Sequence, residues 1–188
     1  MRHLGITAAL VLTACIGSGN QEITPLAQAA REGDAASIAA MVKAGHDPNG
    51  VDPGLNHWTP LLHAIHKRQR SAVDALLAAG ADANRAAGGS APLLMAVGNG
   101  QTDIVATLLT AGADPRADGP ELLATALSGG ALTDIDQPLL GRCNTDVVRL
   151  LLERAPDLRL RPGFRTRIAV LFAKWNHCND ALEMVRIG

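Results

Sequence analysis

Apolar residues recur along the chain at the three- and four-residue spacing of an amphipathic helix. The clearest run is Ile104, Val105, Leu108 and Leu109, and Leu-x-x-Ala-Ala at 26–30 gives a narrower apolar face. Similar patterns predict helices over 122–127, 145–154, 165–175 and 180–187. Ser128–Asn144 contains Gly129-Gly130 and Pro138, which favour a long loop. We therefore expect a mostly α chain built from pairs of short helices.

Two blocks of sequence repeat. Thr24-Pro25-Leu26, Thr59-Pro60-Leu61 and Ala91-Pro92-Leu93 begin three copies that start 35 and 32 residues apart. Each copy ends in a Gly-x-Asp segment, at 41–49, 76–84 and 108–116, and a weaker fourth copy covers 151–157. Thr can cap a helix, Pro fits its first turn, and Gly takes the left-handed conformation that ends it.

These motifs resemble the ankyrin repeat over roughly residues 23–157. The resemblance implies a solenoid of helix-turn-helix units with short β-turn fingers, in about four repeats at 23–56, 57–88, 89–119 and 120–158. The first copy is degenerate, as a solvent-facing cap would be. The last two predicted helices lack the motifs, so we interpret 159–188 as a C-terminal helical cap.

Composition narrows the function classes. The chain has 188 residues, 47% of them hydrophobic and 2% aromatic, with a formal net charge of −1. Few aromatic residues argue against a β-sandwich and favour closely packed helices rich in Ala and Leu. The small net charge and the lack of aromatic residues among the basic ones argue against nucleic-acid binding.

The first residues have the pattern of an export signal. A short basic start precedes nine mostly apolar residues, which are too few to span a bilayer permanently. Leu12-Thr13-Ala14-Cys15 resembles a bacterial lipobox, which implies a signal peptide at 1–14, lipidation of Cys15 and a tether at 15–22. Lipoproteins retained in the inner membrane often have Asp after this Cys, and Ile16 stands there instead, so the resemblance implies an outer-membrane anchor facing the periplasm. The alternative is an ordinary secretory signal cut near Ala14.

Two further cysteines, Cys143 and Cys178, are predicted to lie in the turns before the second helices of adjacent units. If the units stack in register, these turns are neighbours, and an oxidising compartment would allow a disulfide. The alternative is two unpaired thiols.

We find no catalytic motif, phosphate loop or Cys-x-x-Cys pair, so the sequence indicates neither an enzyme nor a cofactor. His57, His63 and His66 form a local cluster, but the simpler interpretation is surface or turn histidines, and we predict no metal site.

The ankyrin resemblance implies that a concave surface of fingers and inner helices binds a protein partner. The variable positions of the family fall here on Arg31, Glu32, Leu55, Asn56, Trp58, His66, Lys67, Ser90 and Asn99. Trp58 is the preferred anchor, since large aromatic side chains often dominate interfaces; alternatively it packs against the 50–57 finger.

Two functions follow. One is a monomeric envelope lipoprotein that sequesters a protein, for example an immunity or inhibitor protein against a toxin. The other is a scaffolding lipoprotein that supports stress defence.

Overall fold

The computed structural model describes residues 23–54, 56–129 and 143–185. Within these residues the chain forms ten helices and no strand, apart from one isolated bridge between Ala87 and Ser90. The predicted signal peptide, Cys15, the tether and Leu55 lie outside the described residues.

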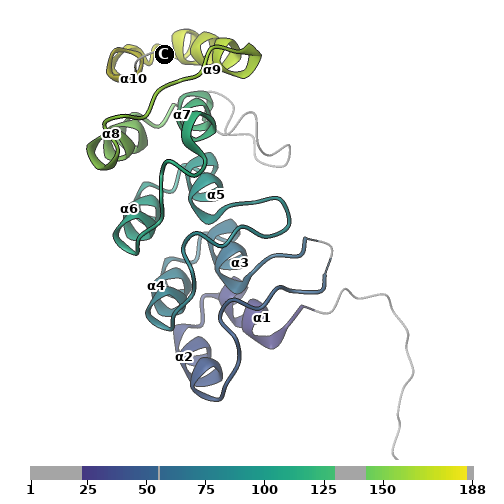
Figure 1. Ribbon diagram of the computed structural model, residues 1–188. Coiled ribbons are helices and arrows are strands. Elements are labelled where there is room, and N and C mark those ends of the chain that lie inside the picture. Colours follow the sequence, from purple (N-terminus) through teal and green to yellow (C-terminus); the bar gives the residue numbers. More distant parts are fainter. Residues whose placement is uncertain (1–22, 55, 130–142, 186–188) are drawn as a thin grey trace, which may run out of the picture.

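The helices stand in two columns (Figure 1). The inner column contains α1 (Pro25–Glu32), α3 (Pro60–His66), α5 (Pro92–Gly98), α7 (Gly119–Ser128) and α9 (Phe164–Trp175). The outer column contains α2 (Ala35–Lys43), α4 (Arg70–Ala78), α6 (Thr102–Thr110), α8 (Thr145–Arg154) and α10 (Asn179–Met184). The connections from α2 to α3 and from α4 to α5 project as fingers from the inner column (Figure 1).

The repeated motifs start and end the helices as expected. The Thr24 and Thr59 hydroxyls accept hydrogen bonds from the amides of Ala27 and Leu62, both at 3.3 Å. At the other end, Gly45, Gly80 and Gly112 all have φ near +90°. The residue after each Gly donates back to the carbonyl five positions earlier, which is a Schellman motif. The same local chemistry therefore ends α2, α4 and α6.

The core runs continuously through the stack because each inner helix packs against the next one. Two inner helices with a neighbour on both sides are buried almost completely: in α3 every residue from Pro60 to Ile65 is buried, and in α7 every residue from Leu122 to Ser128. No helix among the described residues is long and apolar enough to cross a membrane.

The predicted fold class is confirmed. The fourth unit is made of α7 and α8, and the cap of α9 and α10, which begin and end within a few residues of the predicted helices. Most of the predicted long loop, 130–142, lies outside the described residues.

Candidate partner-binding surface

Adjacent fingers are joined by an asparagine that repeats from unit to unit. The Asn49 side chain donates to the Gly80 carbonyl at 3.1 Å and accepts from the Asp82 amide at 2.8 Å. Asn84 makes the same two bonds one unit on, to Gly112 and Asp114, at 2.9 and 2.8 Å. These bonds between fingers, which we call the ladder, fix the position of one finger base relative to the next.

The third step of this ladder uses different chemistry. Arg116 stands where the earlier units have Asn, and its guanidinium donates to both carboxylate oxygens of Asp157, at 3.0 and 2.6 Å. The hydrogen bond from Arg116 holds the pKa of Asp157 below its usual value. Asp157 belongs to the weak fourth copy of the motif, so an ion pair replaces the asparagine bonds at the point where the repeat degenerates.

A second set of bonds joins the turns between inner and outer helices. The Gln69 side chain donates to the Arg31 carbonyl at 3.2 Å, and that of Gln101 donates to the Ile65 carbonyl at 2.7 Å. Each glutamine precedes an outer helix and donates to a carbonyl near the end of the inner helix of the preceding unit; the Ile65 carbonyl also accepts from the Arg68 amide. The stack is thus bonded on both sides of the inner column.

A buried polar pair holds the first finger against α3. The Asp52 carboxylate and His63 Nε2 are 3.0 Å apart, and both side chains are almost fully buried. An ionised Asp52 places the proton on Nε2, which leaves Nδ1 as an acceptor with no partner among the described residues. Burial lowers the pKa of His63 despite the opposing effect of Asp52, and Arg31 lowers it further. His63 is therefore a buried structural residue that joins the first finger to α3, and not a surface histidine.

Trp58 lies along the finger side of α3. Its ring is 5.4 Å from that of His63, edge-on, and 5.0 Å from that of His66. Its carbonyl accepts from the Asp52 amide at 2.8 Å, and the side chain stays partly exposed. The Trp58 side chain thus packs against α3 and still presents surface.

The second finger contacts Trp58 at Gly88. A Cβ on Gly88 would lie 1.7 Å from the Asn56 carbonyl oxygen and 2.8 Å from Trp58 Cδ1, and φ there is +56°. Only glycine allows this approach, so the first and second fingers are packed together and not only joined at their bases.

The structure brings several of the predicted contact residues together. Asn56, Trp58 and His66 cluster through the contacts above, Lys67 follows at the end of α3, and Ser90 lies in the packed second finger. We call Asn56, Trp58, His66 and Lys67 the finger patch. Asn56 and Lys67 are exposed, whereas Trp58 and His66 are partly exposed.

Three other predicted positions fare differently. Arg31 is partly exposed and Glu32 exposed at the end of α1. Asn99 does not fit the expectation of a contact residue, because it is only 8% exposed. Arg68 donates to its carbonyl at 2.7 Å. A position in the repeat predicts which way a residue points, but not that a neighbouring unit's long side chain reaches the same place.

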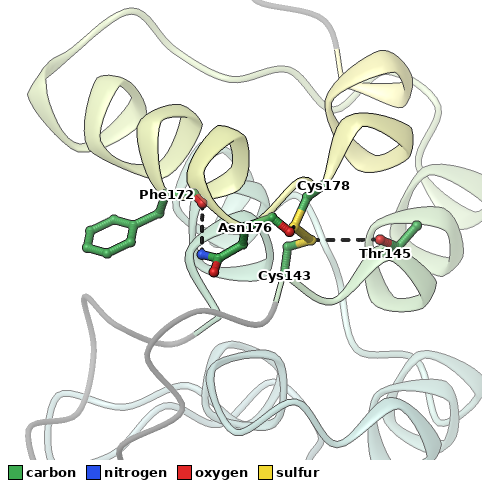
Figure 2. The surroundings of a disulfide bond; sticks show 5 residues. All are labelled: Cys143, Thr145, Phe172, Asn176 and Cys178. Atoms are coloured by element: carbon green, nitrogen blue, oxygen red, sulfur yellow. Dashed lines mark hydrogen bonds between the residues drawn. A yellow bond between two sulfur atoms is a disulfide. The ribbon is translucent and has the colours of Figure 1, made fainter.

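Cys143 and Cys178 form a disulfide with a Cα–Cα distance of 6.3 Å (Figure 2). Cys178 precedes α10, and Cys143 lies two residues before α8, so the bond joins adjacent inter-helix turns. The Thr145 hydroxyl lies 3.8 Å from the Cys143 sulfur (Figure 2). The disulfide lies on the same side of the stack as the Gln69 and Gln101 hydrogen bonds, and in the last unit this covalent bond takes their place.

No group of three or more His, Cys, Asp or Glu side chains among the described residues could hold a metal ion. The histidine cluster of the sequence separates accordingly: His63 is buried against Asp52, His66 lies against Trp58, and His57 is exposed.

The stacked units of two helices and a finger define the chain as a helical repeat solenoid. A model of the family described as ankyrin repeats, in three copies, matches residues 26–119. This is half of the chain, and the chain belongs to the ankyrin-repeat family. No curated protein matches the sequence significantly. Ankyrin repeats are generally protein–protein interaction modules. The match ends at the first residue of α7, although α7–α10 continue the stack.

Proposed function

We propose that this chain is an exported, lipid-anchored protein-binding module whose finger patch engages one protein partner in the bacterial envelope. The observation that carries the binding part is the organisation of the patch. Partly exposed Trp58 is held by the buried Asp52–His63 pair below it and by Gly88 beside it. A surface already ordered in the free protein loses little entropy on binding, and an ordered aromatic residue is a frequent energetic anchor.

The finer role that we propose is sequestration: one partner, such as a toxin or effector that reaches the envelope, is neutralised by occupation of its surface. A rigid, preorganised patch suits tight binding to one target better than loose scaffolding of several. Tight one-to-one binding to a single protein supports this role, whereas recovery of many envelope proteins in similar amounts contradicts it.

The binding site can be tested with two exposed lysines at helix ends, one inside the finger patch and one outside it. Lys67 directly follows inner helix α3, Lys43 is the last residue of outer helix α2, and both side chains are exposed. We expect Lys67→Glu and Trp58→Ala each to reduce recovery of the partner at least about tenfold in a pull-down from envelope extracts. Lys43→Glu should recover as much as the wild-type chain.

Folding must be checked in the same variants, because the Trp58 ring also packs against His63 and His66 of α3. Lys67 is exposed and makes no side-chain bond among the described residues, so its variant should unfold at the wild-type temperature. Unchanged recovery with Lys67→Glu and Trp58→Ala together would show that the partner binds elsewhere.

The anchor is tested separately. A chain lipidated at Cys15 should partition into detergent and be heavier by a diacylglyceryl group, and Cys15→Ala should abolish both properties. A wild-type chain recovered without added mass in the aqueous phase contradicts the lipoprotein proposal and leaves the finger patch unaffected.

A further inference from the structure

The two ends of the inner column differ in the surface that they leave uncovered. At the N-terminal end, the outward side of α1 carries exposed Gln28 and Glu32, which hydrogen-bond to each other. A polar outer face is what a terminal repeat needs to stay soluble. At the C-terminal end, three of the four large hydrophobic residues exposed in the described part of the chain lie on α9: Phe164, Leu171 and Trp175, at 79%, 58% and 78% exposure.

These side chains form one stripe. Together with partly exposed Ile168 they are spaced four, three and four residues apart, so they follow a single face of the helix. The residues that α9 buries, Thr166, Ala169 and Ala173, lie about half a turn away, given about 100° per residue. That second face packs against α7.

The inner helices α3 and α7 have apolar residues on two opposite faces, and a neighbouring inner helix covers each of these faces. α9 has the same pattern with α7 on one side only. Its apolar stripe, which we call the end stripe, therefore has the position and spacing of a contact for one more helix.

The charges beside the end stripe restrict what that helix can be. α9 carries three exposed basic side chains, Arg165, Arg167 and Lys174, and no acidic one. Arg165 pairs with Glu121 of α7, whereas Arg167 and Lys174 have no ion pair among the described residues. A second copy of the chain docked through its own end stripe would bring like charges together, which is unfavourable.

We propose that the end stripe is a second interaction surface, separate from the finger patch, which binds an amphipathic helix of a partner protein whose apolar face is flanked by Asp or Glu. The partner helix packs on α9 as α9 packs on α7. Phe164, Leu171 and Trp175 enter its apolar face, and Arg167 and Lys174 pair with its carboxylates.

The test uses two synthetic helical peptides of the same length as α9, with one Leu stripe in common, flanked in one by Glu and in the other by Lys. Fluorescence anisotropy of the labelled peptides with the full chain should show the Glu peptide binding at least about tenfold more tightly than the Lys peptide. Leu171→Glu should weaken the Glu peptide at least about tenfold, since truncated or charged anchors typically cost that much.

Charge reversal and a matched control complete the design. Arg167→Glu combined with Lys174→Glu should invert the preference, so that the Lys peptide binds more tightly. Val51→Glu, which changes an exposed apolar residue of the first finger, should leave both affinities unchanged. All the substituted side chains are exposed, so the variants should keep the wild-type helix content by circular dichroism.

Three outcomes overturn the proposal. Equal binding of both peptides, or of neither, shows that the end stripe does not select an acidic helix. A concentration-dependent dimer in sedimentation equilibrium that Leu171→Glu abolishes assigns the stripe to a second copy. Binding to phosphatidylglycerol vesicles without binding to the Glu peptide assigns it to a lipid surface. None of these outcomes bears on the Lys67 experiment, so the two proposals can fail independently.

Discussion

Loss of the Cys143–Cys178 disulfide should destabilise the last helical pair much more than the rest of the stack. The bond spans 35 residues of sequence, and the chain-entropy relation for a loop of this length gives about 4 kcal/mol. The bond encloses α8 and α9 and ends at the start of α10. In a repeat array stability is roughly a sum of unit and interface contributions, so the loss should be local to these helices.

Hydrogen exchange followed by mass spectrometry measures this effect in each helix. In a Cys143→Ala, Cys178→Ala double variant, we expect the amides of α9 and α10 to exchange up to about a thousandfold faster than in the wild-type chain. The amides of α3 should exchange at the wild-type rate, because the unit of α5 and α6 lies between α3 and the unit that contains Cys143. Cys15→Ala, which keeps the disulfide, is the matched control and should leave both regions unchanged.

Two results would refute the reasoning. Equal acceleration in α3 and α10 would show that the chain unfolds as one cooperative unit, so that the bond has no local role. Two reactive thiols in the denatured Cys15→Ala variant, titrated without reductant, would show that the bond is not formed in the protein as it is made.

Two further predictions concern the fingers. Asn84→Ala removes two hydrogen bonds between units and should lower the free energy of unfolding by about 1 to 2 kcal/mol in chemical denaturation, whereas Asn56→Ala should cost less than about 0.5 kcal/mol; equal losses would contradict a role for the ladder. Because the pKa of His63 is lowered in the folded chain, the unfolded chain binds more protons in acid, so stability should be full above the ordinary histidine pKa of about 6.5 and fall below it. Urea denaturation at pH values above and below this pKa measures the loss of unfolding free energy in acid. That loss should be smaller for His63→Gln than for the wild-type chain or for the exposed-site control His46→Gln; equal losses in all three would exclude His63 as the cause.

The fold could be predicted from the sequence because its units are built from local signals. Thr59-Pro60 starts a helix and Gly80 ends one through contacts within a few residues, and the repeat then determines how the units stack. The neighbouring turns of Cys143 and Cys178 could be predicted for the same reason, since stacking in register places equivalent turns side by side.

No such local signal predicts the buried Asp52–His63 pair under the finger patch. Asp52 lies in the first finger and His63 lies in α3, 11 residues further along the chain, and the contact between them does not recur in the next unit. A repeat alignment predicts only what recurs. The sequence alone favours a surface or turn histidine at this position, whereas the structure buries His63 against the Asp52 carboxylate.

Asn99 shows a second limit. Its position in the unit suggests exposure on the inner surface, but Asn99 is only 8% exposed, and its carbonyl accepts a hydrogen bond from Arg68 of the preceding unit. Contacts of this kind between units are not contained in the pattern within one unit.

The disulfide and the end stripe have a common physical origin in the position of α9. An inner helix such as α7 gains stability from two helix interfaces, whereas α9 gains it from one and leaves Leu171 and Trp175 in solvent. The exposed stripe contributes nothing to folding, so the last unit should be the weakest unless something else holds it. The disulfide is placed where it makes up that deficit: it anchors the start of α10 to the turn before α8 without covering the outer face of α9. A polar cap would have given a stable end without the surface that we propose for an acidic helix, and an apolar end without a covalent bond would be less stable. The combination keeps an apolar face ordered and available, and it makes the persistence of that face depend on an oxidising environment.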